Sequence, residues 1–226
     1  RVAECRLRSI YMGKFTFNKI SSAVLNLLCA ALEVPAALTV LSKNGLSAFE
    51  FFTNDSNFFA FFACLIMGVS QIKSLAGMVE IPRWVKAVKY AAVCCMTLTA
   101  VVAACVLVPM QGGASAIRPM LISYPMIFHH VICPILCLVS FLFFERSPKI
   151  GKRSVLLGTA PVLLYAAAAI ILNLTGKMKG PYPFLMIKQN PAAISAVWFV
   201  GIIGGAFLLS LLLWKLNFGK KQDKIR

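Results

Sequence analysis

Six apolar stretches, each roughly 20 residues long, constrain this chain more than any other feature. A helix of roughly 20 apolar residues crosses about 30 Å of hydrocarbon. Backbone polar groups in lipid must bond within the protein, so only helices and closed barrels span a membrane, and stretches this long exclude barrel strands. We therefore predict an all-α polytopic membrane protein in which residues 1–226 form one domain. The predicted transmembrane helices are Ile20–Leu41, Leu46–Val69, Tyr90–Val108, Met120–Phe144, Val155–Leu174 and Ala193–Trp214.

The composition excludes a soluble protein. Apolar residues make up 60% of the chain and charged residues only 13%, and the mean hydropathy is +0.83. A soluble core of this size needs a polar coat that this sequence does not supply. The net charge of +16 does not indicate nucleic acid as a partner, because the basic residues are scattered between the apolar stretches.

The distribution of lysine and arginine predicts the orientation of the helices. Eighteen of these residues fall in the two tails and in the second and fourth connections, and five fall in the other connections. Cytoplasmic connections carry the excess of positive charge. We therefore predict a multi-pass protein of the cell membrane with both termini in the cytoplasm and the lipid bilayer as its partner. The last connection, Thr175–Pro191, is then outside, and its apolar Tyr182–Met186 core is predicted to lie on the bundle or at the interface.

Cysteines and histidines offer a metal alternative that we do not favour. Seven of the eight cysteines fall within the predicted helices, where thiols most often pack as small apolar groups, so we expect no disulfides. His129, Cys133 and Cys137 recur every four residues along one helix. Because no other helix offers clear ligands, we expect neither a metal nor a cofactor.

Polar side chains at membrane depth are costly and therefore mark candidate functional residues. Four predicted helices carry them: Glu33 in the first, Thr53–Asn57 in the second, His129 and His130 in the fourth, and Tyr165 in the fifth. At about 1.5 Å per residue, each lies roughly 10–15 Å from the outer end of its helix. This common level predicts one shared polar pocket.

The residue types in this pocket predict nucleophilic chemistry. A hydroxyl needs a base within hydrogen-bond reach, and histidine is the usual base near neutral pH, so Thr53 with a histidine supplies the pair. Asn57, one turn after Thr53, is a candidate oxyanion donor, and Glu33 or Tyr165 is a candidate to orient the imidazole. Structural alternatives remain: the Thr53 cluster as a helix start, the histidines bonded to a neighbouring helix, and Glu33 as their partner.

Three motifs carry a family resemblance. They are Phe51–Asn57 (FFTNDSN), His130–Pro134 (HVICP), and Thr175-Gly176 followed by Pro181–Leu185 (PYPFL). In these motifs and their order, the chain resembles the androgen-induced and androgen-dependent TFPI-regulating proteins, and is more similar still to their bacterial six-helix relatives.

The resemblance implies a membrane-embedded threonine hydrolase, because animal members cleave fatty acid esters of hydroxy fatty acids with one threonine and one histidine. The threonine corresponds to Thr53 and the histidine to His130, with His129 as the second choice. Relatives carry an acidic residue ten positions after the histidine, where this chain has Ser140. We consider this departure minor, since ten helical residues span about 15 Å, too far to orient the imidazole.

We therefore predict a hydrolase of lipid (fatty acyl) esters. The alternative is a non-enzymatic membrane protein, a small carrier or lipid-binding assembly factor, with Glu33 as an ion or proton site. Phenylalanines around Thr53 predict an apolar site for a long-chain lipid ester or fatty acid. Lys177, Lys179 and Lys188 on the last connection are predicted to hold a lipid carboxylate, or else only to anchor that connection at the head groups.

Overall fold

The computed structural model describes residues 2–77, 79–146 and 150–218, and the side chains of residues 2–12 lie outside this description. All regular structure in these ranges is helical. The α-helices are α1 (Val2–Asn44), α2 (Phe52–Leu75), α3 (Arg83–Val102), α4 (Val108–Met110), α5 (Ala114–Ile117), α6 (Cys133–Val139), α7 (Ser154–Leu174) and α8 (Ala192–Phe218). Short 3-10 helices are η1 (Gly45–Glu50) and η6 (Pro183–Leu185), and π-helical segments are η2 (Ala103–Leu107), η3 (Arg118–Ile122), η4 (Phe128–Ile132) and η5 (Ser140–Phe144).

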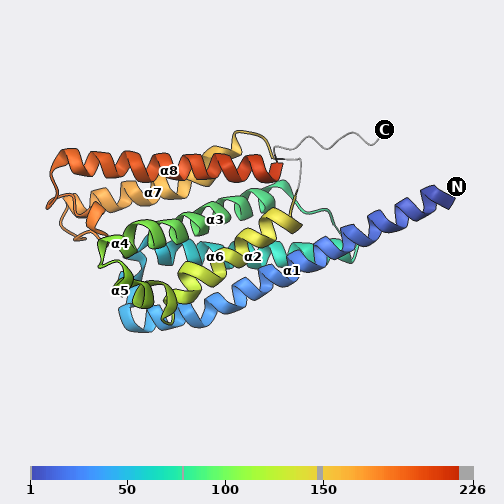
Figure 1. Ribbon diagram of the computed structural model, residues 1–226, viewed down its shortest axis with the longest axis horizontal. Helices are drawn as coiled ribbons and strands as arrows, with labels where there is room; N and C mark the ends of the chain where they lie inside the picture. The colour runs from blue at the N-terminus through green and yellow to red at the C-terminus, as the bar shows by residue number, and fades with distance from the viewer. Residues whose placement is uncertain (1, 78, 147–149, 219–226) are drawn as a thin grey trace.

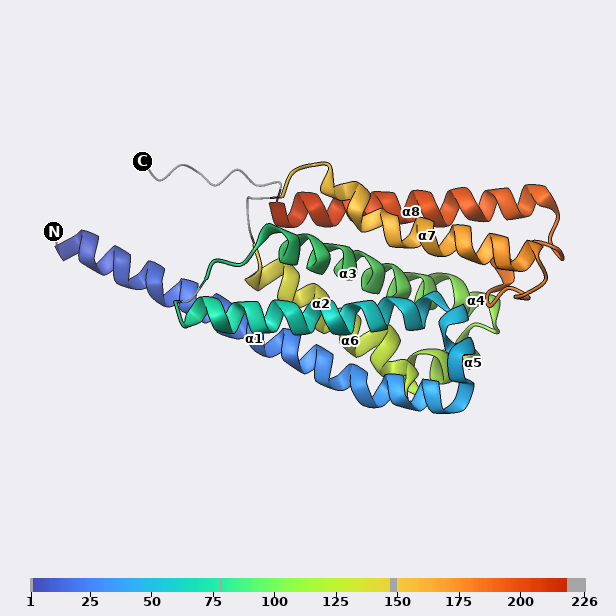
Figure 2. The ribbon, with the colours of Figure 1, turned by 180° about the vertical axis from the view of Figure 1, so that it is seen from behind.

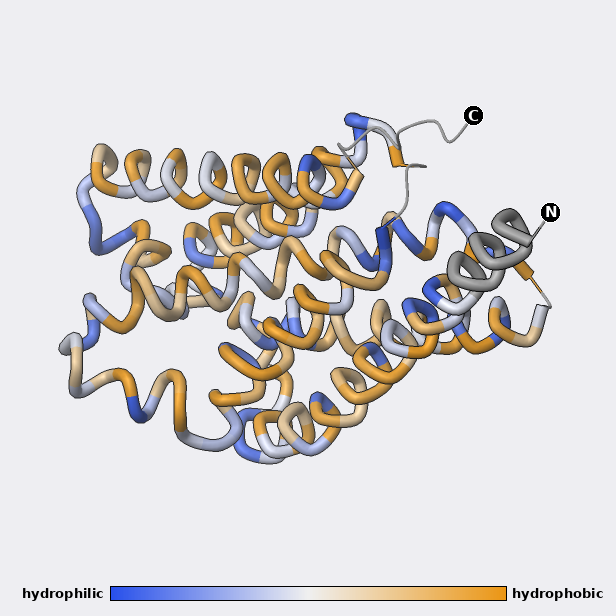
Figure 3. The backbone as a smooth tube through the Cα atoms, turned by 45° about the vertical axis from the view of Figure 1, so that its right-hand side comes forward, coloured by the Kyte–Doolittle hydropathy of each residue, from blue (hydrophilic) through white to orange (hydrophobic). Residues whose placement is uncertain are grey.

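The prediction of a multi-pass membrane protein is confirmed in its general form. Within the described ranges, five helical stretches are long and apolar enough to cross a bilayer: Gly13–Glu50, Phe52–Leu75, Arg83–Met110, Ser154–Leu174 and Ala192–Phe218. The sixth apolar stretch, Phe128–Phe144, forms a shorter helix. Figure 3 shows hydrophobic residues along the helices, with hydrophilic residues concentrated near their ends.

The helices form an elongated bundle with two distinct ends (Figures 1 and 2). At one end α1 begins and α8 ends, and we call this the terminal end. At the other end lie the start of α2, the short α5 and residues 175–191, and we call this the loop end. α3 is the most buried long helix, packed against α2 on one side and α7 on the other. Its position at the centre explains why Lys89, which sequence reasoning placed in a basic connection, is fully buried.

The predicted boundaries of the first two helices are wrong. α1 begins well before Ile20 and includes residues expected to form a tail. It ends where Gly45 adopts a φ of +56°, a conformation that residues with a Cβ rarely adopt. The second helix starts at Phe52 instead of Leu46, because the backbone of Phe51 is extended, with φ of −100° and ψ of 121°. Basic residues at 1, 149, 220, 221, 224 and 226 lie outside the described residues.

The predicted fourth helix, Met120–Phe144, is interrupted. Helical structure ends at Ile122, bends through Ser123–Pro125, and resumes before Phe128. Pro125 explains the break, since proline has no amide hydrogen and disfavours helical backbone at the preceding residue, Tyr124. The break divides the predicted span and brings the carbonyl of Met120 beside a side chain ten residues further along the chain.

The prediction that the last connection lies on the bundle is confirmed. Met178, Tyr182, Phe184 and Leu185 are buried in one apolar cluster with residues of α7 and α8. The ring of Tyr182 stacks on that of Phe184, with centroids 5.1 Å apart. A Cβ at Gly180 would lie 2.6 Å from the Leu185 carbonyl oxygen, so this tight turn requires glycine. The connection is therefore a fixed cover over the loop end.

Candidate active site

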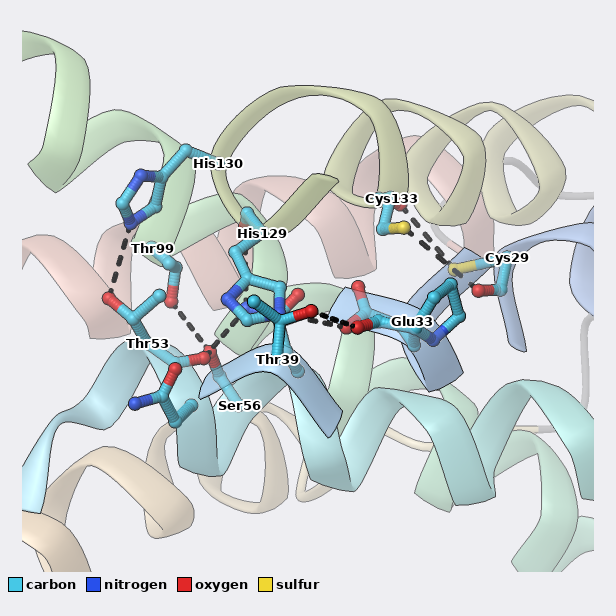
Figure 4. A network of polar contacts seen from close by, with 12 residues as sticks. Cys29, Glu33, Thr39, Thr53, Ser56, Thr99, His129, His130 and Cys133 are labelled. Atoms are coloured by element: carbon cyan, nitrogen blue, oxygen red, sulfur yellow. Dashed lines mark hydrogen bonds and ion pairs between the residues drawn. The ribbon is translucent and has the colours of Figure 1, made fainter. Parts of the chain in front are cut away.

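Thr53 and His130 lie within hydrogen-bond distance inside the bundle. The distance between Thr53 Oγ1 and His130 Nε2 is 3.3 Å, and both residues are buried. Figure 4 shows the imidazole of His130 directed toward the threonine hydroxyl. The predicted proximity of the two side chains is confirmed, whereas their catalytic role stays a prediction.

Thr53 stands in the first turn of α2, not about two turns into a helix. The alternative interpretation of the Thr53 cluster as a helix start is therefore correct as to position. The N-cap residue is Phe51, and the neighbours of Thr53 Oγ1 are His130 and Tyr182. The amide of Asn54 donates from Nδ2 to the Ala48 carbonyl and so ties the helix start to η1. Thr53 Oγ1 therefore faces His130 in η4 and Tyr182 on the last connection.

The hydrogen bonds of His130 fix its tautomer. Nδ1 lies 2.6 Å from the carbonyl oxygen of Met120. Because a carbonyl only accepts, Nδ1 carries the proton, and in the neutral ring Nε2 is the acceptor. Nε2 is the atom that faces Thr53. The imidazole thus presents its lone pair to the hydroxyl while a backbone carbonyl holds the ring in place.

Tyr182 is the site residue that sequence reasoning missed. Its hydroxyl lies 3.3 Å from Thr53 Oγ1 and accepts a hydrogen bond of 3.2 Å from the Thr53 backbone N–H. Burial raises the pKa of Tyr182, so the phenol stays protonated and remains a donor at neutral pH. The sequence feature that could have indicated Tyr182 was the apolar Pro-Tyr-Pro connection. It predicted contact with the bundle but not with Thr53.

Glu33 contacts the other histidine. Glu33 Oε2 lies 3.5 Å from His129 Nε2, and both side chains are about 2% exposed. Adjacent helical residues point about 100° apart, so His129 and His130 face different helices, as Figure 4 shows. The prediction that Glu33 orients the base is therefore wrong for His130 and applies only to the second choice, His129.

Asn57 and Tyr165 also differ from their predicted roles. Asn57 donates from Nδ2 to the backbone carbonyls of Thr53 at 2.6 Å and His129 at 3.3 Å, so its N–H groups are directed at backbone and not at a developing oxyanion. The Tyr165 hydroxyl donates to the Glu50 carbonyl at 2.8 Å and does not orient an imidazole. Both residues instead hold the backbone around the start of α2.

Two apolar cavities lie near the start of α2, and Thr53 lines the smaller one. The smaller has a volume of about 60 Å³ and lies among α2, α3, α7, α8 and the cover, with Thr53 and Tyr182 in its wall. The larger, about 640 Å³, runs between α2, α3 and α7 and includes Asp55 and Ser56. Phe52 and Tyr165 line both cavities, and their rings lie 5.2 Å apart.

The three residues of the metal alternative each lie beside other buried side chains. His129 faces Glu33, Cys133 lies beside Cys29, and Cys137 lies 3.8 Å from Cys64 and 3.1 Å from the Lys89 ammonium. Among the described residues, no group of three or more His, Cys, Asp or Glu side chains forms a metal site. The seven cysteines with described side chains are free thiols. The π-helical turn of η4 shifts the register that put the three on one face.

Comparison with known proteins identifies no relative: no protein family model, no curated protein and no solved structure matches this chain. The essential parts of the site are a hydroxyl, an oriented imidazole, a phenol donor and an adjoining apolar cavity.

Proposed function

We propose that the chain is an intramembrane threonine hydrolase that acts on lipid (fatty acyl) esters. One observation carries the proposal: Thr53 Oγ1 lies 3.3 Å from His130 Nε2 while the Nδ1–H of the same ring donates to the Met120 carbonyl. A nucleophile bonded to a base that a third group orients is the arrangement of covalent catalysis. The motifs around these two residues also support membership of the family of membrane threonine hydrolases, which remains part of the proposal.

The proposed reaction has two steps. Thr53 Oγ1 attacks the ester carbonyl carbon while its proton passes to His130 Nε2, and the leaving alcohol then takes that proton as the C–O bond breaks. Water, deprotonated by the same nitrogen, releases the fatty acid and restores the threonine. Tyr182, 3.3 Å from Thr53 Oγ1, is the proposed donor to the oxyanion of each tetrahedral intermediate. In each step, His130 Nε2 takes the proton of the attacking hydroxyl or water and returns it to the oxygen that leaves the acyl carbon.

The walls of the site support an acyl chain as the substrate. The cavity lined by Thr53 is mainly apolar, and the larger cavity, which shares Phe52 and Tyr165 with it, runs along α2, α3 and α7, where a bilayer supplies extended hydrocarbon chains. Lys177, Lys179 and Lys188 are exposed on the cover. In our proposal, these lysines hold a lipid carboxylate or phosphate at the head-group level while the ester reaches Thr53.

We further propose six membrane crossings in the cell membrane, with Phe128–Phe144 and the segment before it forming the fourth. Six crossings are consistent with α1 beginning and α8 ending at the terminal end. The excess of lysine and arginine there supports a cytoplasmic terminal end and an outward loop end. The site then opens toward the outer leaflet.

Hydrolysis of matched esters by the purified chain in micelles tests the proposal. We expect a long-chain lipid ester to be cleaved in preference to a short soluble one. Thr53→Ala should abolish turnover, whereas Thr97→Ala should keep it, because Thr97 only donates to its own helix at Val93. Replacing the three cover lysines with glutamine should raise KM with little effect on kcat. Turnover that survives Thr53→Ala contradicts the proposal.

The buried contact between Glu33 and His129 favours a second candidate, a non-enzymatic carrier or lipid-binding protein with a proton or ion site. Their side chains form an acid–base pair inside the bundle, 3.5 Å apart. Neither side chain is a hydrogen-bond neighbour of Thr53 Oγ1. Such a pair can share and exchange one proton. Proteoliposomes distinguish the candidates, because a carrier shows substrate-driven proton flux that Glu33→Gln removes, and a hydrolase does not.

A further inference from the structure

A polar cluster lies at the terminal end, far along the bundle from Thr53. Its centre is Glu145, which directly follows η5. Glu145 Oε1 accepts hydrogen bonds from Ser22 Oγ at 3.1 Å, from Asn26 Nδ2 at 2.6 Å, and from Ser140 Oγ. Gln71 Nε2 donates to Ser22 Oγ at 3.1 Å. Elements α1 and η5 are thus joined through one carboxylate oxygen, and α2 joins the cluster through Ser22.

The same cluster leaves buried acceptors without donors. Within the part of the chain that the structure describes, Gln71 Oε1, Glu145 Oε2 and Asn26 Oδ1 have no hydrogen-bond partner. The bonds of Gln71 Nε2 and Asn26 Nδ2 fix the amide orientations, so these oxygens are not exchangeable with the nitrogens. Gln71 is only 4% exposed. A buried acceptor without a donor is destabilising, so the cluster favours a ligand that brings N–H or O–H donors.

Gln71 and Glu145 line a polar cavity of about 280 Å³. That volume far exceeds the roughly 10–15 Å³ that one water needs by this measure. Three cationic side chains, Lys19, Lys86 and Arg146, line it together with the carboxylate of Glu80, and Lys19 Nζ also donates to Ser74 Oγ at 2.6 Å. The remaining lining is Asn18, Ser74 and the apolar groups Phe15, Met67, Ile81 and Phe144. Acceptors, cations and apolar side chains thus occur together in the lining of one cavity.

We propose that this cavity binds a primary ammonium group carried on a phosphate, the chemistry of a phosphatidylethanolamine head group. An ammonium group has three N–H donors and no acceptor, which suits the free oxygens of Gln71 and Glu145. The phosphate suits Lys19 and Arg146 at the rim. The cavity lies where α2 and η5 end and α3 begins, the level at which spanning helices meet lipid head groups. This site does not depend on the proposed hydrolase.

Competition between head groups that differ only in their donors tests the proposal. The purified chain in micelles is given an equimolar mixture of phosphatidylethanolamine and phosphatidylcholine with identical chains, and the retained lipid is measured by native mass spectrometry. Phosphatidylcholine keeps the phosphate but has no N–H. We expect at least a tenfold preference for phosphatidylethanolamine, falling with each added N-methyl group. Equal retention of the two lipids, or stabilisation by sodium alone without lipid preference, overturns the proposal.

Variants show whether this cavity is responsible. Gln71→Leu and Glu145→Gln should each remove most of the preference, whereas Gln189→Leu, the same type of change on the exposed cover, should keep it. Because Gln71→Leu also removes a bond to Ser22, Lys19→Gln serves as a further variant with a different readout: it should lower the retention of both lipids and leave the preference between them unchanged. Free phosphoethanolamine identifies the source: displacement of the lipid indicates a soluble ligand, and retention indicates the membrane lipid. A preference unchanged in both Gln71→Leu and Glu145→Gln contradicts the assignment.

Discussion

Replacement of the proposed base, His130→Gln, distinguishes most clearly between His130 and His129 as the catalytic base. Thr53 Oγ1 has two side-chain neighbours in hydrogen-bond distance, His130 Nε2 and Tyr182 Oη, and only the imidazole accepts a proton near neutral pH. Loss of a general base typically costs 10²–10⁴ in rate. We therefore expect kcat for a long-chain ester to fall by about that factor, or about 3–5 kcal/mol of transition-state stabilisation. KM should change little, since His130 does not line the apolar cavity.

The adjacent residue supplies the matched control. His129→Gln makes the same chemical change one position away, but it removes the contact with Glu33 instead of the contact with Thr53. Ester turnover by both variants is measured in micelles, and circular dichroism confirms that each is folded. We expect His129→Gln to keep most of its activity. Equal losses in the two variants, or full activity in His130→Gln, refute the assignment of His130 as the base.

Three further changes test separate parts of the structure. Gly158→Ala should lower stability by about 1–3 kcal/mol in thermal unfolding, because a Cβ there overlaps the hydroxyl of Ser210 on α8, whereas Gly201→Ala has open space and should be neutral. Tyr182→Phe should lower kcat by about 10²–10³ with the fold intact, as expected for the loss of an oxyanion donor. Lys179→Cys, on the exposed surface of the cover, should react with a membrane-impermeant thiol reagent only from outside the cell, and labelling only from inside contradicts the proposed orientation.

The helical class and the meeting of Thr53 with His130 were predictable from the sequence. Long apolar stretches form helices in lipid, and each one can be recognised from its own sequence. Polar groups at a common level in different spans had reason to meet, because burial without partners is costly. The interruptions at Phe51 and Ser123–Pro125 were missed because the helices were assigned from hydropathy, which does not respond to backbone angles, although Pro125 was a visible signal for the second one.

The details of the site depended on those interruptions and on packing. Met120 became the partner of His130 only because the chain bends between them. Tyr182 reaches Thr53 through a connection whose course is set by its contacts with α7 and α8, which no local pattern contains. The sequence did not decide which histidine Glu33 contacts, because His129 and His130 lie at one depth and differ mainly in direction. The sequence predicted the depth of each polar side chain in the membrane, but not the neighbouring helix that the side chain faces.

Covalent labelling of Thr53 tests the proposed nucleophile most directly. A fluorophosphonate probe is applied to the purified chain in micelles, and the modified residue is identified by peptide mass spectrometry. We predict modification at Thr53, its loss in His130→Gln, and its retention in Thr97→Ala and His129→Gln. Absence of labelling at Thr53, or labelling that persists in His130→Gln, contradicts a threonine activated by His130.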